Sequence, residues 1–147
     1  MSNGIKVKKR DGRIESLDLD KMHLMVDEAC QGLAGVSASQ VEMKSGIQFY
    51  DGITTEEIQE ILIKAASDLI DLDHPNYQFV AARLLLFALR KQLYGKMREL
   101  PHLEPHIMNC TNIDVYDKEI FAKYSKEEID KANSFIDHDR DFLFTYA

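Results

Sequence analysis

The chain has 147 residues, a formal net charge of −7 and an apolar content of 45%. This length fits one domain, or one domain and a piece of another, and the apolar content supports a hydrophobic core and argues against disorder. The acidic balance disfavours sequence-independent nucleic-acid binding, because phosphate contacts require a broad basic face.

The chain has no sequence feature of a secreted or membrane protein. Its first residues, MSNGIKVKKRDG, lack the apolar segment of a signal peptide, and no stretch approaches the roughly 18 apolar residues of a membrane span. Cys30 and Cys110 stand far apart, and no CxxC pair occurs. We therefore expect a reduced, cytoplasmic protein without a zinc ribbon or a dithiol redox site.

A β-hairpin is predicted over about residues 4–17. The segment IKVKK alternates apolar and polar residues, RIESL does so loosely, and Asp11-Gly12 between them is a tight-turn signal. The hairpin region is basic: residues 1–21 hold six basic and four acidic side chains, whereas residues 22–147 hold 12 and 21.

This basic cluster has two interpretations. Lys9 and Arg10 at the turn, with Lys21 soon after, suit a bound phosphate, since arginine offers a planar fork and lysine a point charge. A solvated edge hairpin whose lysines deter aggregation explains the same composition. The residues alone leave both interpretations open.

Three amphipathic helices are predicted after the hairpin. Apolar residues from Leu19 to Leu33 recur with helical spacing, and glycines end this first helix. Ser37 with Gln40 predicts a capping box for a short second helix that runs to about Phe49. The third helix has the sharpest signal: Thr54 is a natural N-cap with Glu57 at N3, and Ile53 and Ile58 suit a hydrophobic staple.

A fourth helix is predicted within NYQFVAARLLLFALRKQLYG, residues 76–95. Pro75 suits its first turn and Gly95 its C-terminal cap. The segment is apolar almost all the way round, so we expect it to be the central and most buried helix. The first hundred residues thus predict a mostly α fold, with a small N-terminal hairpin on about four helices.

The remaining residues carry weaker signals. PHLEP, just after Leu100, predicts a linker, Ser125 with Glu128 predicts a capped helix, and DHDRD at 137–141 suits a charged helix start better than a carboxylate cluster. The final run is apolar, aromatic and uncapped, so we expect the natural protein to continue beyond Ala147.

The residues themselves reveal no catalytic or metal site. His102 and His106 have i, i+4 spacing, but Pro105 lies between them and no third ligand is near. No phosphate-loop, dinucleotide, nucleophile-elbow or HExxH motif occurs. Thr55 and Gln59, one turn apart, suit a ligand contact, yet two exposed polar residues are the simpler reading. Lys91 is likewise more simply explained by pairing with the end of its helix.

Three segments, in order, carry a resemblance to a known family. KVKKRDGRIESLDLDKMH, IQFYDGITTEEIQEILIKAASDLI and PNYQFVAARLLLFALRKQLYG resemble an ATP-cone, a β-hairpin lid on a helical bundle. More narrowly, residues 4–97 resemble the N-terminal ATP-cone of the class I ribonucleotide reductase large subunit, bacterial and phage type. The end, FIDHDRDFLFTYA, resembles the start of that subunit's catalytic region. The expected division is an ATP-cone over residues 1–97 and a linker with the truncated catalytic start over 98–147.

The resemblance implies an allosteric function. ATP-cones bind ATP, which keeps the reductase active, or dATP, which inhibits it by changing subunit assembly, with Mg²⁺ held by the nucleotide and by no protein ligand. It also implies the rest of the large subunit and a radical-generating small subunit as partners, in an oligomer. The parent enzyme is an oxidoreductase that reduces ribonucleoside diphosphates. Neither Cys30 nor Cys110 falls where the resemblance places a catalytic thiol, so this segment carries no catalytic residue.

The resemblance also implies a nucleotide-binding set. The groups that face the phosphates would be Lys9, Arg10, Lys21 and Lys91. The apolar walls for adenine and sugar would be Val7, Leu17, Met22, Phe49 and Ile58. The polar contacts would come from Glu15, Asp18, Thr55 and Gln59. Two members depart from the family pattern. Relatives often have Asn at position 18 and are expected to have His at position 59, so Asp18 loses a donor and Gln59 a potential positive charge.

Other members of the same superfamily remain alternatives. The chain also suits a stand-alone nucleotide sensor, or a degenerate cone that only docks a partner subunit. The zinc-containing repressor of reductase genes carries a cone too, but the absence of CxxC pairs argues against it. The ending FIDHDRDFLFTYA favours class I over the anaerobic glycyl-radical reductase.

Overall fold

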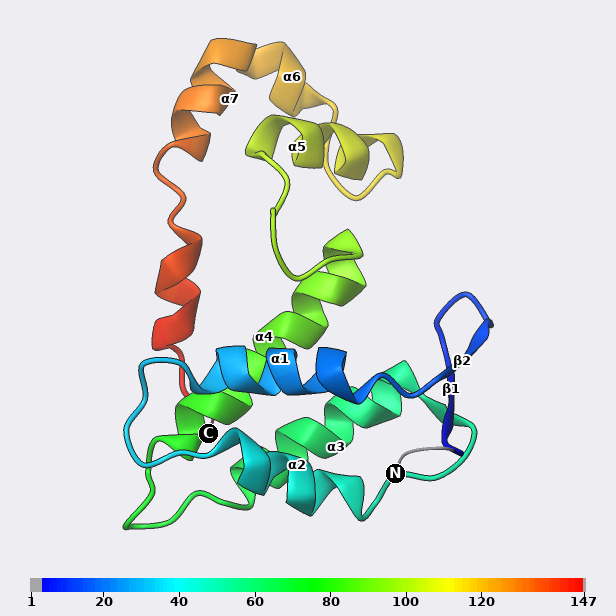
Figure 1. Cartoon of the computed structure of the whole chain (residues 1–147). Coiled ribbons are helices and arrows are strands. Elements are labelled where there is room, and N and C mark those ends of the chain that lie inside the picture. Colours follow the sequence, from blue (N-terminus) through cyan, green and yellow to red (C-terminus); the bar gives the residue numbers. More distant parts are fainter. Residues whose placement is uncertain (1–3, 147) are drawn as a thin grey trace. The chain divides into compact units, whose positions relative to one another are not determined.

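The structure is a computed structural model that describes residues 4–146 (Figure 1). It divides into two compact units. The first unit extends to Leu89 and includes the segment that starts at Asp141, and the second unit is Arg90–Arg140. Within residues 4–146, no helix is long and apolar enough to cross a membrane.

The predicted hairpin is confirmed. Strands β1 (Lys6–Lys8) and β2 (Ile14–Ser16) are antiparallel, with Val7 opposite Glu15. The Lys9 N–H donates to the Arg13 carbonyl at 2.8 Å, and the Gly12 N–H donates to the Lys9 carbonyl at 2.9 Å. Gly12 has a φ of +87°, a left-handed conformation that glycine adopts without steric cost and that closes the tight turn.

A third strand was not predicted from the sequence. β3 (Ile53–Thr54) pairs in parallel with β1, and Val7 and Ile53, which face each other in this register, are both buried. Two residues are too few to show alternation, and Thr54 also caps the following helix. This pairing fixes the hairpin beside the start of α3.

Helices α1 (Leu19–Cys30) and α2 (Ala38–Gly46) follow the hairpin and contact each other. As predicted, glycine ends α1: Gly32, with a φ of +73°, follows the C-cap Gln31. The second predicted helix is correct in position, but it ends at Gly46 rather than near Phe49.

The predicted capping box of α2 is only half formed. Ser37 accepts from the Gln40 N–H at 3.4 Å, but the Gln40 side chain instead accepts from the Tyr77 hydroxyl at 3.3 Å. The Ser37 N–H donates to that same hydroxyl at 3.0 Å. The prediction of a reciprocal box was therefore wrong, because a buried tyrosine from a distant segment supplies the second half.

Helix α3 (Thr55–Ser67) begins as predicted. Thr54 and Glu57 form both halves of a capping box, and the staple residues Ile53 and Ile58 are buried. The carboxylate of Glu57 also accepts from the Tyr50 hydroxyl at 2.8 Å. These bonds hold the pKa of Glu57 below its usual value, the Thr54 backbone N–H contributing most.

Helix α4 (Tyr77–Tyr94) differs from its prediction in two respects. Pro75 lies in the turn before the helix, and the buried residues occupy one face: Tyr77, Val80, Ala81, Leu84, Phe87 and Arg90. Leu85, Leu89 and Leu93 are exposed along another face. The expectation that this is the most buried helix was wrong, because its burial is confined to one face.

The second unit contains helices α5 (Leu103–Asn112), α6 (Glu119–Lys123) and α7 (Lys126–Asn133). PHLEP, predicted as a linker, instead opens α5. Pro105 stands at the third helical position, where its missing N–H costs no helical hydrogen bond. The Asn133 side chain accepts the Leu103 N–H at 2.9 Å, and the predicted capping box at the start of α7 is confirmed.

The segment DHDRD partly fulfils its prediction. A 3₁₀-helix (His138–Leu143) forms there instead of an α-helix. Within the first unit, the Phe142 ring lies 6.2 Å from that of Phe87, and the Arg83 guanidinium lies 5.4 Å from the Phe142 ring centre. The mostly helical architecture with an N-terminal hairpin agrees with the predicted fold class.

Candidate functional site

One face of the hairpin changes from apolar to charged along its length. Because side chains alternate along a strand, Ile5, Val7 and Lys9 share a face. The Leu17 N–H donates to the Ile5 carbonyl at 3.0 Å, and Glu15 lies opposite Val7. The face therefore begins with two apolar residues at the open end and reaches a lysine at the turn.

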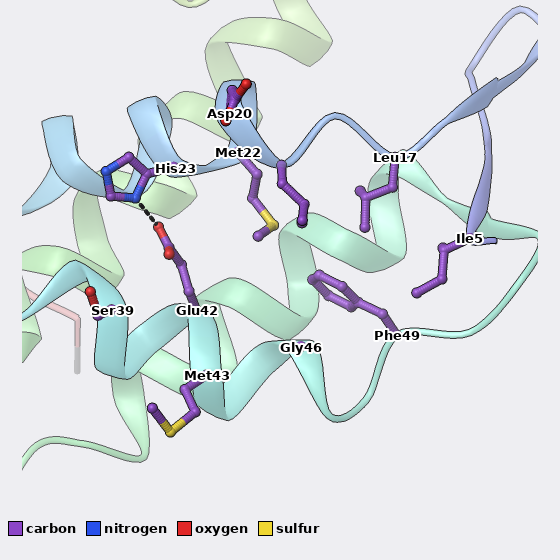
Figure 2. A pocket seen from close by; sticks show the side chains of 11 residues that line it. Ile5, Leu17, Asp20, Met22, His23, Ser39, Glu42, Met43, Gly46 and Phe49 are labelled. Carbon is purple, nitrogen blue, oxygen red and sulfur yellow. Dashed lines mark hydrogen bonds and ion pairs between the residues drawn. The ribbon is translucent and has the colours of Figure 1, made fainter. Parts of the chain in front are cut away.

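A cavity of about 460 Å³ opens at the apolar end of this face (Figure 2). Leu17, Met22 and Phe49, all predicted walls, point toward one another there. Other elements of the first unit complete the lining: Ile5, Leu19, Asp20, His23, Ser39, Glu42, Met43 and Gly46. Its volume is that of a small-molecule site, and its described lining has acidic groups and a histidine but no lysine or arginine. Such a lining suits an uncharged, flat group better than an anion.

The cationic end of the hairpin is held by ion pairs. Lys9 Nζ lies 3.4 Å from a Glu15 carboxylate oxygen, and Arg10 Nε lies 2.6 Å from Glu56. Thr55, at the first position of α3, has its hydroxyl 3.5 Å from the Lys8 carbonyl. Arg10 and Thr55, which both contact Glu56, thus lie together where the turn meets α3, while Lys9 contacts Glu15 within the hairpin.

Asp18 and Lys21 meet at the start of α1. The Asp18 carboxylate accepts the Lys21 backbone N–H at 2.9 Å, which makes Asp18 the N-cap of this helix. Asp18 was predicted only as a ligand contact, although its position before an apolar helical pattern is a capping signal. This cap gives an independent structural reason for an acidic residue at position 18.

Three further predicted residues are buried. Val7 is 3% exposed, Ile58 is 7% and Gln59 is 8%. The simpler sequence reading of Gln59 as an exposed polar residue was therefore wrong. Within residues 4–146, its side-chain amide makes no hydrogen bond to the protein, and the amide atoms themselves stay accessible to water.

Lys91 is the one predicted residue outside the first unit. It lies in the last turn of α4, in the part of that helix that belongs to the second unit. Its assignment to the nucleotide site therefore stays a prediction.

An ion pair on the rim of the cavity was not predicted. His23 Nδ1 on α1 lies 2.7 Å from a Glu42 oxygen on α2 (Figure 2). The hydrogen bond and charge of Glu42, with smaller contributions from Asp27 and Asp20, raise the pKa of His23 above its usual value. The two residues are 19 positions apart, so only the packing of α1 on α2 reveals the pair.

A family described as the ATP cone domain matches residues 5–92. This match covers more than half of the chain and includes the hairpin, the cavity and most of α4. The chain belongs to the ATP-cone family, as the resemblance of its three segments predicted.

Similarity to individual proteins identifies a narrower group within this family. The whole chain is 49% identical to the ribonucleoside-diphosphate reductase 1 subunit alpha of Escherichia coli strain K12 and 47% identical to the corresponding alpha subunit of Haemophilus influenzae. The alpha subunit of Enterobacteria phage T4 is 42% identical over 97% of the chain. These matches confirm the resemblance to the bacterial and phage type. The chain spans 19% of the length of each relative.

Proposed function

We propose that this chain is the domain that controls the overall activity of a ribonucleoside-diphosphate reductase large subunit, by binding ATP as activator or dATP as inhibitor. The observation that carries this proposal is the gradient along one hairpin face, from an apolar cavity at the open end to cations at the turn. A nucleotide has the same polarity, with a flat apolar base at one end and phosphates at the other.

The base and sugar belong at the cavity end. Leu17, Met22 and Phe49 provide apolar and aromatic contact for adenine, and Val7 and Ile58 extend the apolar support beneath the hairpin. Asp18 and Glu15 are acceptors, which suits the amino group of adenine or a ribose hydroxyl.

The phosphates belong at the turn. Arg10 offers a guanidinium fork, Lys9 and Lys21 offer point charges, and Thr55 offers a hydroxyl at the N-terminus of α3, where backbone N–H groups favour anions. Mg²⁺ would be held by phosphate oxygens. The described residues contain no cluster of three or more His, Cys, Asp or Glu side chains that could hold a metal without the nucleotide.

Gln59 supports a polar ligand near the start of α3. It lies one turn after Thr55, its side chain is largely buried, and its solvent-accessible amide has no hydrogen-bond partner among the described residues. An amide that is open to solvent can donate to, or accept from, a ligand group in place of water.

The wider role rests on the relatives. They are reductase alpha subunits, so we assign to the parent protein the reduction of ribonucleoside diphosphates, with the rest of the large subunit and a radical-generating small subunit as partners in an oligomer. The effectors differ by one 2′-hydroxyl. A site that hydrogen-bonds this hydroxyl discriminates strongly between ATP and dATP, whereas an apolar contact gives a difference in binding free energy of about 1–3 kcal/mol.

Calorimetric titration of the 147-residue chain with ATP and with dATP, each with Mg²⁺, tests the proposal. We expect saturable binding of both nucleotides, weakened in Lys9→Ala and Lys91→Ala. Lys64→Ala, which removes an exposed lysine near the far end of α3, is the matched control and should bind normally. Absence of heat with either nucleotide would reject the sensor and favour a cone that only docks a partner.

A further inference from the structure

We propose that Glu56 is an internal competitor for the phosphate-binding groups, so that an incoming phosphate must displace its carboxylate from Arg10. This inference rests on the function proposed above and adds a device that sets the affinity of the site. Glu56 is not among the residues that the family resemblance assigns to nucleotide binding.

The carboxylate of Glu56 contacts two of the groups assigned to phosphate. One oxygen lies 2.6 Å from Arg10 Nε, and the other lies 3.3 Å from the Thr55 hydroxyl. A carboxylate and a phosphate present similar oxygen acceptors to a guanidinium. The Glu56 carboxylate therefore contacts Arg10 and Thr55 in the way that a bound phosphate would.

Glu56 is not needed to cap α3. The adjacent Glu57 closes the capping box with Thr54 and also accepts from Tyr50, so the cap is complete without Glu56. Its general contribution as an acidic residue in the first helical turn is shared with Glu57. The specific contacts of Glu56 are those to Arg10 and Thr55.

The ion pair is open to exchange. The Arg10 and Glu56 side chains are 37% and 45% exposed, so water and solutes reach both partners. Exposed ion pairs contribute little to stability, and a multiply charged phosphate can replace the carboxylate. Arg10 cannot hold both anions in the same geometry. The apparent affinity for phosphate is therefore reduced in proportion to the fraction of molecules in which Glu56 is paired with Arg10.

Displacement has a structural consequence within the first unit. Arg10 lies in the hairpin turn and Glu56 in the first turn of α3, so their ion pair ties these two segments together. When a phosphate pairs with Arg10, the direct ion pair between the hairpin turn and α3 is replaced by a contact through the ligand. The competition acts on the phosphate end only, so adenosine binding is independent of Glu56.

Calorimetry on Glu56→Gln tests this competition with three probes: ATP with Mg²⁺, inorganic tripolyphosphate and adenosine. We expect Glu56→Gln to bind ATP and tripolyphosphate about fivefold more tightly than the unaltered chain, and adenosine equally. Glu56→Ala should behave similarly and serves as the second variant. Glu60→Gln, which removes an exposed acid one turn further along α3, should change little.

A double variant separates specific competition from a general change in charge. In an Arg10→Ala background, Glu56→Gln should no longer tighten binding, because its target is absent. If Glu56→Gln matches Glu60→Gln while the unaltered chain binds ATP, the competition is refuted and the proposed function stands. If no variant, nor the unaltered chain, binds ATP, both are refuted. An equal gain with and without Arg10 would also refute the competition.

Discussion

The carboxylate of Asp18 accepts the backbone N–H of Lys21 at 2.9 Å and thereby starts α1. Both residues belong to the predicted nucleotide-binding set, so the helix cap fixes the spacing of two candidate ligand contacts. Met22, the next residue, lines the cavity. A single local interaction therefore supports both the first helix and one side of the proposed site.

Substitutions at Asp18 should separate its two roles. Asp18→Ala removes the cap and should lower the free energy of unfolding by about 1 kcal/mol. Asp18→Asn keeps a capping oxygen, so stability should be retained, while a new N–H donor and the loss of a negative charge should tighten ATP binding. Denaturant unfolding and calorimetry measure the two effects. Weaker ATP binding by a stable Asp18→Asn chain would contradict the assignment.

The Thr54–Glu57 capping box should contribute measurably to stability. Thr54→Ala leaves the Glu57 backbone N–H without its side-chain acceptor, and we expect a loss of about 1 kcal/mol in the free energy of unfolding. Thr54→Ser retains the hydroxyl and should recover most of that loss. Equal stability of the alanine and serine variants in urea unfolding would show that the cap contributes nothing.

The His23–Glu42 pair should make the contact between α1 and α2 depend on pH. The folded-state pKa of His23 is raised above 6.5, so its stabilising contribution is full below the unfolded value and is lost as pH rises through the folded one. His23→Gln should therefore be less stable than the unaltered chain at about pH 5.5, and the difference should shrink toward about pH 8.

Urea unfolding of both chains across this pH range measures that difference, and NMR titration measures the histidine pKa directly. Glu42 supplies the two largest contributions that raise the pKa of His23, so Glu42→Gln should lower that pKa. A difference between the chains that is constant with pH would rule out a contribution from the charged histidine.

Cys30 should react slowly with alkylating reagents in the folded chain. Burial, with a smaller contribution from Asp27, raises the pKa of its thiol to about 11. Because the thiolate is the reactive form, alkylation by iodoacetamide near pH 8 should be about 100-fold slower than in the unfolded chain. Mass spectrometry of the peptide that contains Cys30, with and without denaturant, provides the comparison. Equal rates would contradict the burial of this thiol.

Local signals in the sequence predicted much of the fold. The caps at Thr54 and Ser125 and the glycine turn at Gly12 depend on residues three or four positions apart, so their patterns are visible without tertiary structure. Interactions between distant segments were missed. The pairing of β1 with β3 and the contact of Tyr77 with Ser37 join residues about 40 or more positions apart.

Some features of the candidate site were likewise predicted from the sequence, and others were not. Leu17, Met22 and Phe49 were assigned together through the family resemblance, and the structure brings them to one cavity. The burial of Gln59 and the ion pair of Arg10 with Glu56 were not predicted, because burial and contacts between distant segments depend on tertiary packing. Charge and spacing reveal which residues can bind a phosphate, whereas packing decides which carboxylate competes for them.

The central claim is that an adenine nucleotide lies along one face of the hairpin, and amide chemical shifts of the labelled chain test it most directly. With ATP and Mg²⁺ added, we expect large changes at Val7, Glu15 and Leu17 and around Phe49 and Thr55, while residues of α7 in the second unit change little. No saturable changes, or changes confined to α5 and α7, would contradict the account.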